Sequence, residues 1–215
     1  MSAGGRAMRR LGSRLLAALD VPDSDDTLLP AVGEAVTRVR GRPVRLHAVA
    51  FPPELASGLW IDRAGQDVIA YERNTDLDHQ LVIIGHEVWH MFEGHCGSLT
   101  AHGPAASRAL GEGMPDALRE LVAGICDDGS AGTPGEERMD LGLHVALRAD
   151  AQADDPAGDP AGDPAVVRQE EEAEFFGYRF ATSVREALAE ARSLADPERL
   201  EGRIQVSLVH RIRGS

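Results

Sequence analysis

The sequence predicts an α+β protein that is mainly helical, with a small antiparallel sheet of about three strands packed on one central helix. Several segments carry apolar residues at helical spacing, whereas residues 44–72 contain short runs that alternate as strands do. Aromatic residues make up only 4% of the 215-residue chain, and hydrophobic residues make up 43%. This composition favours alanine-rich helices around one substantial core over an aromatic-rich β-sandwich.

The first predicted elements are two helices, over residues 7–19 and 27–40. Large apolar residues recur in both at helical spacing, which places them on one face of each helix. Gly41 and Pro43 then mark a change of structure. We therefore expect a helical segment over residues 1–41, followed by a domain over residues 42–215.

Three strands and a helix are expected next. VRLHAVAF alternates as a strand does, and GLWIDR and DVIAYER, at residues 58–63 and 67–72, form a predicted hairpin. The following helix has Thr75 or Asp76 as its expected cap and Gly94 as its expected end.

The second half of the chain has fewer periodic signals. We expect a helix near residues 105–126 and a short helix in LGLHVALRA. The acidic Pro/Gly repeat over residues 150–166 lacks side chains that could build a core, so we expect a disordered insertion. A long helix is predicted over residues 166–194, where apolar residues again follow helical spacing.

The charge and the hydropathy pattern exclude several classes of function. The formal net charge is −13, which argues against direct binding of nucleic acid. No apolar run approaches the roughly 20 residues of a spanning helix, so no membrane association is expected. Cys96 and Cys126 match no disulfide framework and no zinc-binding cysteine pattern, which indicates a cytoplasmic protein.

The motif HEVWH, residues 86–90, carries the chemistry. His86 and His90 lie one helical turn apart on one face, so both imidazoles can reach a single Zn²⁺ ion. Glu87 faces another direction, and in H-E-x-x-H proteins this glutamate is the general base that acts on a metal-bound water. Coincidental histidines on a surface helix are the alternative, but the apolar flanks indicate a buried helix.

A catalytic zinc site needs a third protein ligand. His95 stands nine residues after His86, which does not match metzincin spacing, so it is expected to support a ligand or end the helix. The better candidate is the cluster EEEAEFFGYRFA on the long helix. Glu170 is expected to bind the ion and Glu174 to orient a histidine, with Glu171 and Glu172 as competing ligands.

Two tyrosines are candidates for stabilising an oxyanion or docking a substrate. Tyr178 shares the helix face of Glu170, and Tyr71 lies on the second hairpin strand, where an extended peptide could bind.

Taken together, GLWIDRAGQDVIAYERN, HEVWHMFEGH and EEEAEFFGYRFA resemble the ImmA/IrrE family of zinc metallopeptidases. The resemblance implies that His86, His90 and Glu170 are the zinc ligands and that Glu87 is the catalytic base. Such proteins are often encoded beside helix-turn-helix repressors. By analogy they cleave a regulator, or bind and inactivate it.

Two functions follow as expectations. The first is a zinc-dependent endopeptidase that hydrolyses a peptide bond in a protein partner, which we expect to be a transcriptional regulator. The alternative is a non-catalytic, zinc-containing interaction protein that binds and titrates such a regulator. A Glu87→Gln exchange separates them, since only the first needs the base.

Overall fold

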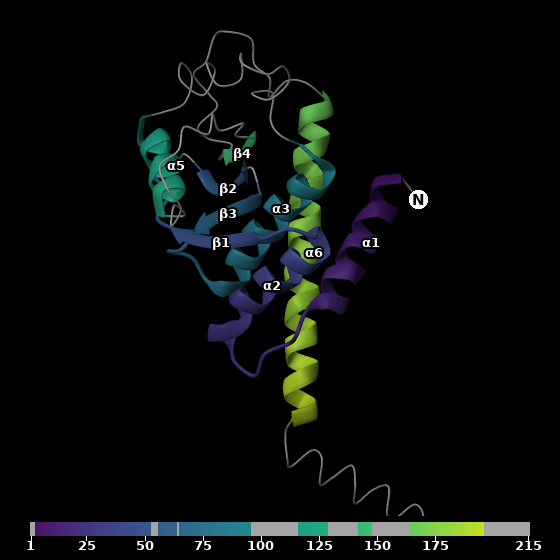
Figure 1. The fold of residues 1–215 in the computed structure, drawn as a ribbon. Coiled ribbons are helices and arrows are strands. Elements are labelled where there is room, and N and C mark those ends of the chain that lie inside the picture. Colours follow the sequence, from purple (N-terminus) through teal and green to yellow (C-terminus); the bar gives the residue numbers. More distant parts are fainter. Residues whose placement is uncertain are drawn as a thin grey trace, which may run out of the picture.

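The computed structural model describes residues 3–52, 56–63, 65–95, 116–128, 142–147 and 164–195 (Figure 1). In chain order the elements are α1 (Ala3–Ala18), a 3₁₀ turn (Asp25–Thr27), α2 (Leu28–Arg40), β1 (Val44–Val49), β2 (Ala56–Arg63), β3 (Gln66–Glu72), α3 (Leu77–Glu93), α5 (Asp116–Asp128), β4 (Gly142–Leu147) and α6 (Pro164–Ala195).

The strands form one mixed sheet in the order β1-β3-β2-β4. β2 and β3 pair antiparallel as the predicted hairpin, with Trp60 opposite Ile69. β1 runs parallel to β3, and β4 pairs antiparallel with β2. The α+β class is confirmed, but the sheet is mixed instead of purely antiparallel. The chain reverses direction between β1 and β2 and reverses again in the hairpin between β2 and β3. β3 therefore runs in the same direction as β1.

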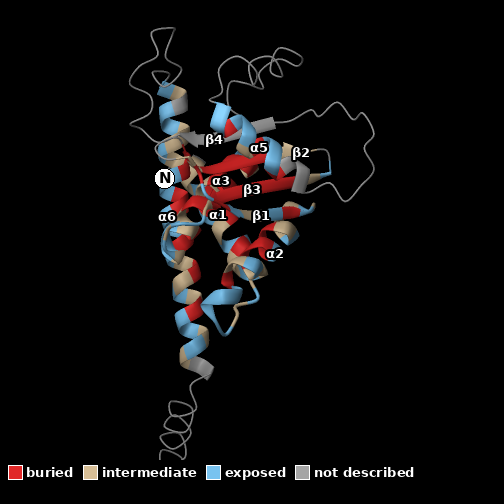
Figure 2. Cartoon of the chain, turned by 90° about the vertical axis from the view of Figure 1, so that its left-hand side faces the viewer, coloured by how far each residue is buried: buried red, intermediate tan, exposed pale blue. Residues whose placement is uncertain are grey.

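The sheet separates two apolar layers, and buried residues line both of its faces (Figure 2). On one face Trp60, Ile69 and Tyr71 pack with residues of α1, α2, α3 and α6 in a single core. On the other face Leu59, Ile61, Val68 and Ala70 pack against α5. The N-terminal helices therefore share the core that also holds α3 and α6.

A buried aspartate joins the hairpin to the helices. Asp67 is fully buried and accepts hydrogen bonds from Arg40 Nε at 2.9 Å, Trp60 Nε1 at 2.9 Å and Arg42 Nε at 2.6 Å. Arg42 also pairs with Asp62, and Arg40 Nη1 donates to the carbonyl of Met91 in α3. These bonds hold the end of α2, the hairpin and the second half of α3 together.

The helix and strand predictions mostly agree with the structure. The expected helices at the N-terminus and over residues 166–194 correspond to α1, α2 and α6, and Asp76 caps α3 by accepting a hydrogen bond from His79 N. The expected short helix in LGLHVALRA is wrong, because residues 142–147 form β4. Pairing with β2 makes that segment a strand, and a local sequence pattern does not reveal pairing with a strand far away in the chain.

Other predictions lie partly outside the described residues. Of the helix expected near 105–126, residues 116–128 are described and are helical. The acidic insertion lies outside the described residues up to 163, and residues 164–166 already belong to α6. Among the helices described, no segment has the length and apolar character that crossing a membrane requires.

Candidate metal centre

The helix α3 carries the HEVWH motif through the core. Leu81, Ile84 and Val88 are fully buried, and Gly94, with φ of 71°, ends the helix in the left-handed conformation that favours glycine. An apolar stripe of this kind fixes the rotation of the helix about its axis. The rotation places His86 and His90 toward the first turns of α6.

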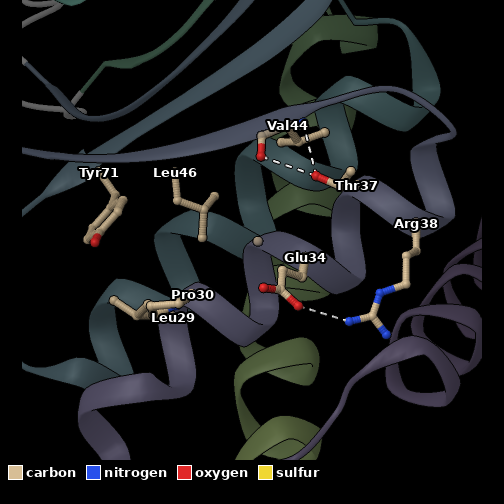
Figure 3. A pocket seen from close by; sticks show the side chains of 9 residues that line it. Leu29, Pro30, Glu34, Thr37, Arg38, Val44, Leu46 and Tyr71 are labelled. Atoms are coloured by element: carbon tan, nitrogen blue, oxygen red, sulfur yellow. Dashed lines mark hydrogen bonds and ion pairs between the residues drawn. The ribbon is translucent and has the colours of Figure 1, made fainter.

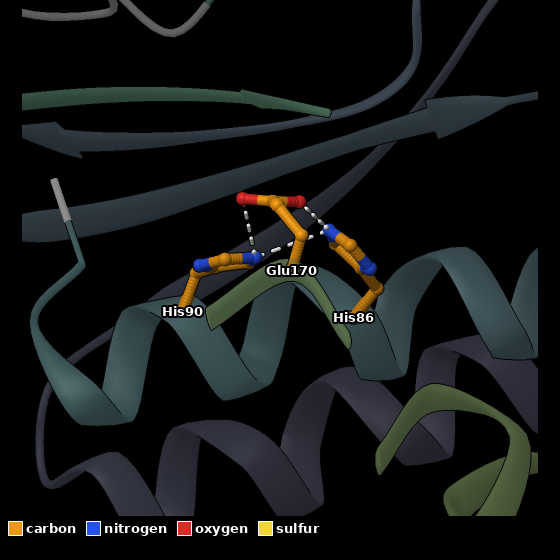
Figure 4. Close-up of side chains that lie close together, drawn as sticks. All are labelled: His86, His90 and Glu170. Carbon is orange, nitrogen blue, oxygen red and sulfur yellow. Dashed lines mark hydrogen bonds and ion pairs between the residues drawn. The ribbon is translucent and has the colours of Figure 1, made fainter. Parts of the chain in front are cut away.

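His86, His90 and Glu170 come together in one cluster (Figure 4). The two Nε2 atoms lie 3.1 Å apart. The Glu170 carboxylate spans them, with Oε2 3.4 Å from His86 Nε2 and Oε1 3.6 Å from His90 Nε2. Thus the glutamate that the sequence placed some eighty residues away lies directly over both imidazoles, whereas Glu171 and Glu172 take no part in the cluster.

These separations can be compared with a real coordination sphere. Two ligand atoms that each bind zinc at 2.0–2.1 Å in a tetrahedral arrangement lie about 3.3 Å from one another. The three observed distances bracket that value, and imidazole nitrogens with a carboxylate oxygen form a donor set that zinc takes in proteins. The residues present therefore fit a metal ion.

Exposure differs across the cluster. The His90 side chain is fully buried, that of His86 is 16% exposed and that of Glu170 is 43% exposed. An ion held by the three would be covered on the His90 side and reached from the side of His86 and Glu170. A site with one accessible side is what a catalytic metal requires, since a substrate must approach it.

A contact between two glycines explains why Glu170 reaches the histidines. A Cβ added to Gly177 would lie 2.6 Å from the carbonyl oxygen of Val82, and one added to Gly85 would lie 2.9 Å from the Cα of Gly177. The backbones of α3 and α6 therefore touch at this crossing. Glu170 lies two helical turns before Gly177, which sets it over the turn of α3 that bears His86 and His90.

Aromatic packing supports the same crossing. Trp89 is 1% exposed and stacks on Phe176 of α6, with ring centroids 5.2 Å apart. Phe176 in turn stacks on Phe180 at 6.2 Å. Because α3 and α6 are joined by this apolar contact, the metal cluster lies on a rigid helix pair.

Glu87 and His95, the other two candidate residues of this segment, lie in different environments. Glu87 is fully buried, one residue and about 100° around the helix from His86. The chain reverses at Gly94, and His95 then packs edge-on against His90, with ring centroids 5.4 Å apart. Its backbone N–H donates to the carbonyl of His90 at 3.0 Å. His95 thus touches His90 without joining the cluster.

Glu174 lies outside the cluster, Tyr178 lies further along α6 and Tyr71 lies on β3. Glu174 is exposed and Tyr178 is 54% exposed, because each step of four residues along α6 moves about 40° further around the helix from Glu170. Tyr71 is buried on β3 and lines a pocket of about 500 Å³ beside α2, with Leu29, Leu46 and Glu34 among its walls (Figure 3). This pocket contains none of the three cluster residues. Burial raises the pKa of the Tyr71 hydroxyl above its usual range.

Comparison with known proteins adds no family to this picture. No protein-family model matches the sequence, and neither the curated proteins nor the solved structures contain a significant match. Only the residues of this chain and their geometry therefore bear on its function.

Proposed function

We propose that the protein is a zinc-dependent endopeptidase of the ImmA/IrrE type, with His86, His90 and Glu170 as metal ligands and Glu87 as the general base. The observation that carries the proposal is the convergence of two histidines from an H-E-x-x-H helix with a glutamate from a distant helix. HEVWH supplies two of the donors, and the packing of α6 against α3 supports Glu170 as the third.

The chemistry follows from the positions of these residues. A zinc ion bound there would supply Lewis acidity, lowering the pKa of a coordinated water to about 7 and polarising a carbonyl. Glu87 is not among the three clustered residues and is buried next to His86 in the sequence, and we assign its carboxylate to take a proton from the attacking water and to pass it to the leaving amine. Burial keeps that carboxylate from bulk solvent and strengthens its electrostatic effect.

The partner we propose is a protein in the cytoplasm, specifically a transcriptional regulator of the helix-turn-helix type. The resemblance of HEVWHMFEGH and EEEAEFFGYRFA to the family is the support for this choice. The net charge of −13 favours a regulator's protein surface over its DNA as the binding partner.

Metal analysis and a peptidase assay test the proposal together. Protein purified without chelator should carry about one zinc per chain and cleave fluorescein-labelled casein. Glu87→Gln should keep the zinc and lose activity by about 100-fold or more, because the proton acceptor is removed while the ligands remain. The exposed Glu174→Gln serves as the matched control and should keep both properties.

Two outcomes would contradict the proposal. Absence of stoichiometric zinc after gentle purification would exclude a metal centre. Full activity of Glu87→Gln would exclude the assigned base. Zinc without any cleavage of casein, or of a neighbouring-gene repressor used as the substrate, would favour a binding protein that holds the ion as structure.

A further inference from the structure

The strand β2 passes over α3 at a point where it has no side chain. A Cβ added to Gly58 would lie 2.6 Å from Oε1 of Glu87, 3.2 Å from Cγ of Glu87 and 2.8 Å from Cγ2 of Ile83. Cβ atoms do not approach other heavy atoms this closely, so a methyl group at this position requires that something moves. Glycine inside a strand commonly marks such a close approach.

The strand is also irregular here. Against β4, Ala56 pairs with Leu147 and Gly58 with Ala146, which leaves Ser57 as an extra residue between them. A bulge of this kind bends a strand and changes where its residues face. On its other side Gly58 pairs regularly with Tyr71 of β3, so its distance from α3 is fixed by the sheet.

We propose that Gly58 is a positioning residue for Glu87. The absent side chain provides the space that the Glu87 carboxylate occupies, and the backbone of β2 at Gly58 covers that carboxylate on the side that faces the sheet. The atom nearest to an added methyl is Oε1 of Glu87, the end of a side chain that can rotate, so the carboxylate is displaced first. His86, His90 and Glu170 are not among the three nearest contacts, so the direct overlap falls on Glu87 and Ile83.

The inference rests on the proposed function in one respect, that Glu87 is the base of the reaction. Apart from that, it depends only on the close contact between Gly58 and Glu87. Displacing a general base by about 1 Å can lower the rate of a reaction by about 100-fold without weakening substrate binding. Gly58→Ala should therefore behave as a defect of catalysis, in contrast to a defect of metal binding.

The first test uses metal-free protein and no activity measurement. Gly58→Ala should lower the melting temperature by about 2–10 °C, because an added methyl overpacks this contact. In a Glu87→Ala background the same exchange should lower it by less than half as much, since the carboxylate is gone. Equal losses in both backgrounds would overturn the proposal. Ser57→Ala, at the bulge beside Gly58, is the control and should act equally in both.

Folding itself provides a second readout. If Gly58→Ala alone fails to fold, Gly58→Ala/Glu87→Ala should recover a cooperative melting transition, because the overlap with the carboxylate is removed. Failure of the double variant to fold would assign the cost to Ile83 or to the backbone and would overturn the proposal.

The last test uses zinc-loaded protein with labelled casein. Gly58→Ala should retain about one zinc per chain and an unchanged KM while kcat falls by about 100-fold. Loss of zinc from this variant would overturn the proposal, since it would place the effect on the ligands. If the wild-type protein holds no zinc or cleaves nothing, the proposed function fails, while the melting temperatures still decide whether Gly58 and Glu87 interact.

Discussion

At the scale of single residues, three consecutive glutamates have different environments. Glu170 lies over the two histidines, with carboxylate oxygens 3.4 and 3.6 Å from their Nε2 atoms. Glu171 is exposed, and Glu172 lies toward α1, where a Cβ on Gly4 would meet its Oε1 at 2.9 Å. Successive residues of a helix diverge by about 100°, so only one of the three can face α3 in this way.

Exchanging Glu170 should therefore weaken metal binding selectively. Glu170→Ala is expected to lower the affinity for zinc by more than about 100-fold, since losing a ligand should exceed the 10–100-fold cost of losing a group that only supports one. Glu171→Ala is the matched control and should bind zinc as the wild type does. Competition with a zinc-sensitive dye measures both affinities, and an unchanged value for Glu170→Ala would exclude this glutamate as a ligand.

Asp67 shows how one buried charge joins three elements. Its carboxylate accepts from Arg42, Trp60 and Arg40, and all three donors would lose their charged acceptor if the charge were removed. Asp67→Asn should cost about 3–5 kcal/mol of unfolding free energy, as expected for breaking a buried ion pair. Asp62→Asn removes a partly exposed partner of Arg42 and should cost less than about 1 kcal/mol. Urea unfolding compares the two variants.

The same carboxylate predicts a dependence of stability on pH. Burial alone would raise the pKa of Asp67, but the hydrogen bonds from Arg42, Trp60 and Arg40 outweigh it and lower the pKa below its usual value. The ionised group thus stabilises the fold above the unfolded-state pKa of about 3.9, and this stability is lost as the pH falls through the lower folded value. The difference in unfolding free energy between wild type and Asp67→Asn should shrink below about pH 4. A constant difference down to pH 2 would contradict this explanation.

At the scale of elements, the crossing of α3 and α6 determines the geometry of the His86, His90 and Glu170 cluster. Gly85 and Gly177 allow the two backbones to touch, and the stacked rings of Trp89 and Phe176 hold the helices together beside that contact. The distance between the helices at Gly177 determines how far Glu170 stands from His86 and His90. Close packing leaves no room for adjustment, because the nearest atom to an added Cβ is a backbone oxygen.

Gly177→Ala should therefore separate the helices. We expect a loss of about 1–3 kcal/mol from overpacking, together with a weaker affinity for zinc because Glu170 moves away from the histidines. Gly12→Ala in α1 is the control: a Cβ there meets nothing within 4 Å, and alanine should stabilise this helix by up to about 1 kcal/mol. Thermal unfolding and zinc titration report the two effects. A Gly177→Ala protein as stable as the Gly12→Ala protein would contradict the close contact.

At the scale of the whole molecule, the candidate metal centre would join α3 to α6, which are also held together by apolar packing and by the ion pair of Asp78 with Arg185. A ligand that binds only the folded state stabilises it by RT ln(1 + [L]/Kd), or about 2.7 kcal/mol at a hundredfold excess over Kd. Because the ligands come from residues 86, 90 and 170, the unfolded chain cannot present them together.

Removing the metal should lower the melting temperature of the whole fold. For a chain of this length, a loss of about 2.7 kcal/mol corresponds to about 5–11 °C. EDTA should produce this shift in wild type and Glu87→Gln, which keep all three ligands, and a much smaller one in Glu170→Ala. Calorimetry with and without chelator measures it. An equal shift in all three proteins would show that EDTA acts elsewhere.

The sequence by itself determined the class of fold, most of its helices, the hairpin and the face of α3 on which His86 and His90 lie. Each of these depends on neighbours within a few residues, which hydrophobic spacing and capping residues report directly. It also placed Glu170 among candidate ligands, while the order of preference over Glu171 and Glu172 rested on a resemblance. Isolated glycines inside the helices, Gly85 and Gly177, were the one local signal of a close helix contact.

Only the tertiary structure decided how distant segments meet. It made residues 142–147 a strand by pairing them with β2, turned Glu174 and Tyr178 to solvent, and placed Tyr71 beside α2, away from the histidines. It also brought Gly58 over Glu87 and buried Asp67 among two arginines and a tryptophan. These relations depend on packing between residues far apart in the chain, and the local periodicity of a sequence carries no record of which elements become neighbours.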